Sequence, residues 1–274
     1  MEKGGDAMNI KLLAIDVDGT LLHDNHELSE RTKEAIFRIK EEGVRVVLAT
    51  GRGPRSCDPL IEALQLTDPM ITHNGAVIYN PVRNMAEQQV GFEAKELLPI
   101  IRYCRSRNIH FDVNTAFGIY VEQLREEVVP VYKQFFVEPV VVDDIGSLTD
   151  PIVKLTLTDQ PHRLDQVMND IVPQFPDLSI IRSGETFIDV IHPQATKANA
   201  LRYLLQKFRI SPDEVMAFGN YYNDLEMLQL AGTGVAMGNA PREVQQQADI
   251  VTQSNNEDGV ALVIENMLRD KLVV

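Results

Sequence analysis

Short apolar runs alternate with helix-like stretches at both ends of the chain, and this alternation restricts the possible folds more than any other feature. Residues 12–15 form an apolar run that stops at two acidic residues. A helix pattern with Ser29 as its N-cap follows, and a second apolar run covers residues 44–49. Strand, helix and strand at this spacing predict parallel strands joined by a crossover helix. We therefore expect an α/β fold with a parallel sheet.

The parallel pattern stops near residue 84 and returns after residue 192. The segment between them combines two helix patterns with period-2 apolar alternation, which suits an antiparallel sheet with one buried face. Its predicted elements are helices at residues 94–107 and 161–172 and strands at residues 117–121, 152–157 and 187–191. We predict a discontinuous core domain, residues 1–84 and 192–274, with an α+β domain inserted at residues 85–191.

Charge and composition exclude several classes of partner. The 274 residues include 26 Lys and Arg against 40 Asp and Glu, which gives a formal net charge of -14. A field of that sign repels nucleic acid and anionic membranes, so we expect neither as a partner. No apolar run has the length of a membrane helix, and residues 1–7 lack the apolar core of a signal peptide. Two cysteines do not indicate a disulfide framework, so we expect a cytoplasmic protein.

Polar segments follow the predicted parallel strands, and ligands of open α/β sheets bind at that edge. Asp16 and Asp18 come directly after the first apolar run, where two neighbouring carboxylates are costly unless a cation or a proton lies between them. Thr50 and the backbone N–H groups after the second run suit a phosphate oxygen. Lys197, just inside a predicted helix start, offers a charge that neutralises phosphate and carboxylates.

Four segments resemble, in order, the four motifs of the haloacid dehalogenase (HAD) superfamily of phosphatases: Asp16-Val17-Asp18-Gly19-Thr20, Thr50-Gly51-Arg52, Lys197 and Gly219-Asn220-Tyr221-Tyr222-Asn223-Asp224. The resemblance implies that Asp16 attacks phosphorus and forms an aspartyl-phosphate. It also implies that Asp18 protonates the leaving oxygen and then deprotonates the attacking water. Both roles are within the chemistry of a carboxylate, which can serve as a nucleophile or transfer a proton.

The resemblance also implies how phosphate and metal are held. The implied phosphate-binding residues are Thr50, Gly51, Lys197 and Asn223. The residues implied beside the substrate are Arg52 and Asn74, and the implied Mg²⁺ ligands are Asp16, Asp18, Asn220 and Asp224. Asn220 departs from the family pattern, which usually has aspartate at this position. An amide oxygen can still bind a hard cation but carries no charge, so we expect a Mg²⁺ site whose affinity stays open.

The insert resembles the C2B cap of the Cof-type (IIB) subfamily in its position, size and mixed α+β pattern. This resemblance implies a Rossmann-like HAD core with a cap domain that sets substrate specificity. It implies a small-molecule phosphate ester as substrate, such as a flavin-pathway phosphate like 5-amino-6-(5-phospho-D-ribitylamino)uracil, a sugar phosphate or pyridoxal phosphate. The oligomeric state, monomer or dimer, stays open.

Two other functions are compatible with parts of the pattern, and a third is disfavoured by it. Asn220 allows a catalytically weak protein that keeps the fold and binds or senses a ligand. A phosphomutase would use the same nucleophile and move the phosphoryl group within a sugar phosphate. Carbon–halogen hydrolysis is disfavoured by Asp18, because a halide leaves without a proton.

Overall fold

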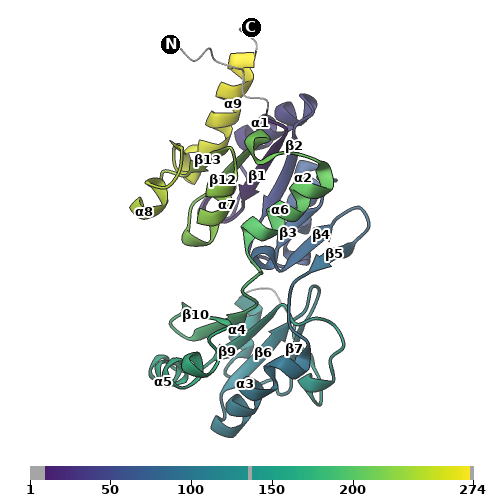
Figure 1. The fold of residues 1–274 in the computed structure, drawn as a ribbon, viewed down its shortest axis with the longest axis vertical. Coiled ribbons are helices and arrows are strands. Elements are labelled where there is room, and N and C mark those ends of the chain that lie inside the picture. The colour runs from purple at the N-terminus through teal and green to yellow at the C-terminus, as the bar shows by residue number, and fades with distance from the viewer. Residues whose placement is uncertain (1–9, 135–137, 272–274) are drawn as a thin grey trace. The chain divides into compact units, whose positions relative to one another are not determined.

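The computed structural model describes residues 10–134 and 138–271, so residues 1–7 lie outside the described part. The chain divides into two compact units (Figure 1). The core unit comprises Met1–Glu87 and Thr196–Val274, and the insert unit comprises Gln88–Ala195. The sequence-based prediction places the insert at residues 85–191.

An eight-stranded sheet forms the centre of the core unit, in the order β14-β13-β12-β1-β2-β3-β4-β5. Its strands are β1 (Leu12–Asp16), β2 (Arg45–Ala49), β3 (Met70–Thr72), β4 (Val77–Asn80), β5 (Met85–Gln89), β12 (Val215–Gly219), β13 (Thr233–Ala236) and β14 (Ile250–Val251). The strands from β14 to β3 pair in parallel, and β4 pairs with β3 antiparallel. The expected parallel α/β core is therefore present.

Helices cover both faces of this sheet. They are α1 (Glu30–Glu41), α2 (Asp58–Leu64), α6 (Lys197–Phe208), α7 (Leu225–Leu230), α8 (Arg242–Gln245) and α9 (Gly259–Lys271). α1 packs against α2 and α9, whereas α6 packs against α7 (Figure 1). Leu12 and Ala14 lie in one hydrophobic cluster with α6 and α7, and the alternation of side chains along β1 directs Leu13 and Ile15 to the opposite face. All four side chains are buried, as a strand covered on both faces requires.

The insert unit contains a six-stranded sheet in the order β10-β11-β9-β6-β7-β8. Its elements are α3 (Ala94–Arg107), β6 (His110–Asn114), β7 (Ile119–Val121), α4 (Val129–Gln134), β8 (Val140–Val141), β9 (Lys154–Thr158), α5 (Pro161–Ile171), β10 (Ser179–Gly184) and β11 (Phe187–Ile191). Pairing is antiparallel except between β7 and β8. Leu155 and Leu157 point to the side where α3 and α5 pack, while His110, Asp112 and Thr156 are buried on the other face.

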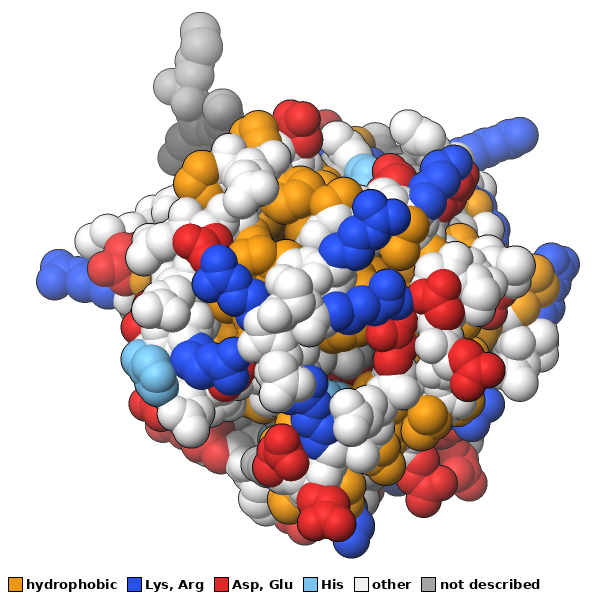
Figure 2. Space-filling view, turned by 90° about the horizontal axis from the view of Figure 1, so that it is seen from below, with side chains coloured by type: hydrophobic (Ala, Val, Ile, Leu, Met, Phe, Trp, Pro, Cys, Tyr) orange, Lys and Arg blue, Asp and Glu red, His pale blue; other side chains and the backbone are white. Residues whose placement is uncertain are grey.

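Basic and acidic side chains are interspersed on the face of the molecule that Figure 2 shows, and they do not gather into a patch of one sign. The insert unit contains ion pairs between such side chains. Arg105 contacts Asp144 at 2.6 Å, and Arg163 contacts Asp159 at 2.8 Å. Among the described residues, no helix is both long and apolar enough to cross a membrane. Cys57 and Cys104 are both buried and form no disulfide.

Candidate active site

Parallel pairing brings three strand ends to one edge of the core sheet. β1 lies between β12 and β2, and Ile15 aligns with both Phe218 and Leu48. β1 ends at Asp16, and the segments that follow β2 and β12 begin at Thr50 and Asn220, so these three positions lie side by side at the edge of the sheet. Neighbouring parallel strands end at the same edge, so residues some 200 positions apart in sequence become neighbours in space.

Lys197 connects the first and fourth motifs. Its Nζ donates to Oδ1 of Asp16 at 2.6 Å and to Oδ1 of Asp224 at 2.7 Å. Thr196 caps α6 by accepting the backbone N–H of Asn199, which places Lys197 in the first turn of the helix. The Lys197 side chain is only 1% exposed, and a buried ammonium requires such carboxylate partners.

Burial and the neighbouring charges shift the pKa values of Asp16 and Lys197 in opposite directions. Burial raises the pKa of Asp16 to about 6, although the positive charge of Lys197 opposes this rise. Burial alone would lower the pKa of Lys197, but the charges of Asp16 and Asp224 outweigh it and the pKa is raised. The ammonium is therefore charged throughout the neutral range, and Asp16 is mostly ionised above about pH 7.

Asp224 shapes the loop between β12 and α7. Its Oδ2 accepts the backbone N–H groups of Asn220 at 2.9 Å and Tyr221 at 3.0 Å, and its Oδ1 faces Lys197. A Cβ at Gly219 would lie 2.5 Å from Cβ of Asp224, so only glycine permits this approach. Both carboxylate oxygens of Asp224 are engaged by the protein, which makes it a positioning residue in this arrangement.

Asp18 occupies a different environment from Asp16. Its side chain is 45% exposed, whereas that of Asp16 is 7% exposed. Arg52 donates from Nε and Nη2 to the two Asp18 oxygens at 2.9 and 2.5 Å, and His26 Nδ1 lies 3.6 Å from Oδ1. The pairing with Asp18 raises the pKa of Arg52, because the carboxylate favours the charged guanidinium. Arg52 therefore contacts the second carboxylate of the first motif.

Thr50, Gly51 and Asn74 form the adjoining part of the site. Thr50 is fully buried, its hydroxyl oxygen accepts the Arg52 N–H at 3.1 Å, and its carbonyl accepts the Asn74 N–H at 2.9 Å. A Cβ at Gly51 would come within 3.2 Å of the Asn74 amide. Asn223 in turn donates from Nδ2 to Oδ1 of Asn74 at 3.0 Å. The structure thus joins the second motif, the turn after β3 and the fourth motif by direct contacts.

The predicted Mg²⁺ ligands separate into two groups. The end of the Asn220 carboxamide, Oδ2 of Asp16 and the carbonyl oxygen of Asp18 converge, with the amide end 3.1 Å from each of the other two. Oxygens that share an octahedral Mg²⁺ at 2.0–2.1 Å lie about 2.9 Å apart, so the two 3.1 Å spacings around the amide end suit the cation when the amide oxygen occupies that end. Asp224 lies outside the trio, and Asp18 joins it through its backbone. Among the described residues no cluster of three His, Cys, Asp or Glu suits a metal, so the mixed trio is the candidate site.

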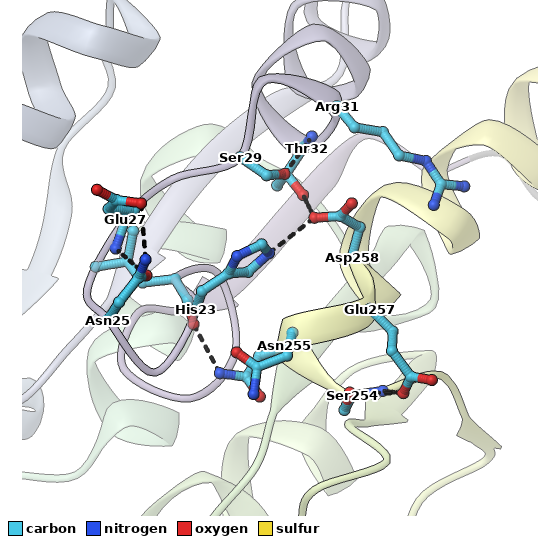
Figure 3. Close-up of polar contacts among 12 residues, drawn as sticks. His23, Asn25, Glu27, Ser29, Arg31, Thr32, Ser254, Asn255, Glu257 and Asp258 are labelled. Carbon is cyan, nitrogen blue, oxygen red and sulfur yellow. Dashed lines mark hydrogen bonds and ion pairs between the residues drawn. The ribbon is translucent and has the colours of Figure 1, made fainter.

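Sequence reasoning missed the residues that fix the loop after the first motif (Figure 3). His23 Nε2 lies 3.0 Å from Oδ1 of Asp258, and Asn255 donates from Nδ2 to the Leu22 carbonyl at 2.9 Å and to Asp24 at 3.0 Å. These partners lie just before α9, more than 230 residues away in sequence. The run of cap-forming residues from Ser254 onward was the available signal, but it does not identify its partner.

Comparison with known proteins gives a consistent result over nearly the whole chain. The family described as haloacid dehalogenase-like hydrolase matches residues 13–264. "Putative phosphatase YxeH" of Bacillus subtilis is 34% identical over 270 residues, which cover 95% of this chain and 99% of the relative. "5-amino-6-(5-phospho-D-ribitylamino)uracil phosphatase YcsE" of the same species is 31% identical over 259 residues, covering 94% of this chain and 96% of the relative.

Solved structures agree with these relatives. A haloacid dehalogenase-like hydrolase from Bacteroides thetaiotaomicron superposes with a TM-score of 0.84 at 30% identity, covering 94% of this chain and 99% of the other. TM0651 from Thermotoga maritima gives a TM-score of 0.87 at 31% identity, with coverage of 94% and 97%. The chain therefore belongs to the haloacid dehalogenase-like hydrolases, alongside relatives that are named as phosphatases.

Proposed function

We propose that this hydrolase is a Mg²⁺-dependent phosphatase of small phosphorylated metabolites that acts through an aspartyl-phosphate on Asp16. The observation that carries the proposal is the difference between the two carboxylates of the first motif. Asp16 is buried beside a charged lysine, which favours an ionised, desolvated nucleophile. Asp18 is partly exposed, so water can reach it, as the role of an acid that later acts as a base requires.

The reaction then follows from these two groups. A carboxylate oxygen of Asp16 forms a bond to phosphorus as the bond to the ester oxygen breaks, and the protonated carboxyl of Asp18 gives its proton to that oxygen. In the second half, Asp18 takes a proton from water, and the water oxygen attacks phosphorus and releases Asp16 and inorganic phosphate. Lys197 and the N–H groups after Thr50 hold negative charge throughout. A Mg²⁺ held by the oxygen trio would neutralise charge on the transferring phosphoryl group.

The insert unit is proposed to act as the cap that determines which leaving group is accepted. The buried polar face of its sheet supports this role, because a sheet face with several buried polar side chains is unusual for a purely structural layer. Three relatives named as 5-amino-6-(5-phospho-D-ribitylamino)uracil phosphatases support including a flavin-pathway phosphate among the candidate substrates. Sugar phosphates and pyridoxal phosphate complete the set to be compared.

Phosphate release from a panel of these esters, with Mg²⁺ or with EDTA, tests the proposal. Asp16→Asn should reduce turnover by at least ~10³-fold, because it removes the nucleophile. Asp213→Asn changes an exposed carboxylate of the same unit and serves as the matched control with unchanged turnover. Mass spectrometry of acid-quenched protein should detect phosphorylated Asp16. Full turnover by Asp16→Asn, or Mg²⁺-independent turnover, would overturn the proposal.

A further inference from the structure

The side chain of Asn220 is confined by the loop of the first motif. A Cβ at Gly19 would lie 2.4 Å from Nδ2 of Asn220, so the glycine, with its φ of +76°, is required for this close approach. The amide end also lies 3.2 Å from Oγ1 of Thr20, 3.1 Å from Oδ2 of Asp16 and 3.1 Å from the carbonyl of Asp18. The side chain of Asn220 is therefore held in place by its neighbours. A half-turn of the carboxamide about the Cβ–Cγ bond exchanges its nitrogen and oxygen without displacing the rest of the side chain.

The two orientations of this amide serve opposite purposes. With Oδ1 at the contact position, it accepts the Thr20 hydroxyl but also faces two other oxygens, the Asp16 carboxylate and the Asp18 carbonyl. Three converging oxygens are stable together when a cation lies among them. With Nδ2 at the same position, the amide donates its two hydrogens to Asp16 and Asp18. Each orientation therefore corresponds to one state of the candidate metal site.

The charge balance explains why an amide and not a carboxylate suits this exchange. Lys197 is the ammonium that faces two buried carboxylates, Asp16 and Asp224. An aspartate at position 220 would add a third negative group beside Oδ2 of Asp16. The neutral amide avoids this repulsion and supplies a donor.

We propose that Asn220 is a two-position residue that holds Asp16 by hydrogen bonds without a cation and turns its oxygen inward to bind Mg²⁺. The proposal rests on the Mg²⁺ site of the proposed function. It makes Asn220 a positioning residue that keeps the nucleophile ordered between rounds of metal binding. Mg²⁺ should bind more weakly with Asn220 than with an aspartate at this position. The cation must displace two hydrogen bonds, and it gains a neutral ligand in place of a charged one.

Asn220→Asp tests this inference through stability and metal binding, neither of which requires a substrate. In EDTA, thermal unfolding of Asn220→Asp should begin several degrees below that of the unaltered protein, and saturating Mg²⁺ should remove or reverse the difference. Calorimetric titration should show Mg²⁺ binding about tenfold tighter or more in the variant. Asn223→Asp, the same change three residues away, should leave Mg²⁺ affinity within about twofold.

Equal Mg²⁺ affinity and equal stability in EDTA for Asn220→Asp would overturn the inference. If that variant does not fold, ¹⁵N NMR of the unaltered protein tests the inference instead. The Asn220 side-chain amide should exchange slowly with solvent in EDTA and rapidly with Mg²⁺, and no change on adding Mg²⁺ would overturn the inference. A protein that shows the exchange but hydrolyses no phosphate ester would refute the proposed function alone. Mg²⁺-dependent hydrolysis with no effect of Asn220→Asp would refute this inference alone.

Discussion

Replacing Lys197 by methionine keeps most of the length of the side chain and removes the ammonium between Asp16 and Asp224. All three side chains are at least nine-tenths buried, so water cannot replace the lost charge without opening the structure. Removing one partner of a buried ion pair costs about 3–5 kcal/mol, because the charge left behind stays desolvated. We therefore expect Lys197→Met to lower the free energy of unfolding by about 3–5 kcal/mol at pH 7.5 in EDTA.

This loss should shrink as the pH falls. Burial already raises the pKa of Asp16 to about 6 in the presence of Lys197, and without the ammonium that pKa should rise further. An unfolded aspartate has a pKa of about 3.9, so the folded variant binds a proton that the unfolded chain releases near neutral pH. Stability of Lys197→Met should consequently decrease as pH rises from about 4 through the folded pKa, and it should recover in acid.

Urea unfolding at pH 5.5 and 7.5 measures both effects. Lys11→Met is the matched control, because Lys11 pairs with Glu214 at 2.5 Å on the surface of the same unit and its side chain is 49% exposed. Exposed pairs contribute little, so the control should change stability far less than Lys197→Met does. A loss below about 1 kcal/mol in Lys197→Met, or an equal loss at both pH values, would refute the reasoning.

Two further predictions concern other parts of the chain. Burial raises the pKa of Asp112 to about 6 and lowers the pKa of His110 to about 4, so between pH 4 and 6 the first makes stability fall with rising pH and the second makes it rise. In Asp112→Asn only the His110 contribution remains. The free energy of unfolding of this variant, relative to that of the unaltered protein, should therefore rise by about 1–2 kcal/mol from pH 4 to pH 6 in urea unfolding. A difference that does not change with pH would contradict this prediction. Gly75→Ala would place a Cβ 2.1 Å from the Thr196 carbonyl oxygen at a φ of +101°, and should lower stability by about 2–4 kcal/mol. Gly43→Ala, at a φ of +82° with no atom within 4 Å, should cost about 1 kcal/mol, and equal losses for the two variants would contradict the steric argument.

The sequence predicts best those elements whose apolar pattern is local. β1 and β2 are apolar runs that stop at polar residues, and each lies where it was expected. α3 begins and ends at the predicted residues because its buried side chains recur with helical spacing. β5, with the sequence Met-Ala-Glu-Gln-Gln, carries no alternating apolar signal and was not predicted. β5 lies at the edge of the sheet and has one neighbour, β4. Its conformation is therefore determined by pairing with β4 and not by an alternating pattern of side chains.

The site shows the same division between local and long-range information. Strand ends locate Asp16 and Thr50, and a helix start locates Lys197, each from a few neighbouring residues. The sequence does not show that one ammonium spans carboxylates 181 and 27 residues away, because that depends on how α6 packs over the sheet. For the same reason the anchoring of the loop after β1 by Asn255 and Asp258 was not predicted.

Two carboxylates two residues apart acquire different properties because β1 ends between them. In a continuous strand, residues 16 and 18 would point to the same face and share one environment. β1 ends at Asp16, and Gly19 turns the chain at a φ of +76°, so Asp16 stays buried with Lys197 while Asp18 reaches solvent and Arg52. A nucleophile needs desolvation and a fixed charge, whereas a proton carrier needs exchange with water. Under the proposed mechanism, the turn after β1 therefore separates these requirements before any substrate binds, and a change that lengthened β1 past Asp16 would place both carboxylates in one environment.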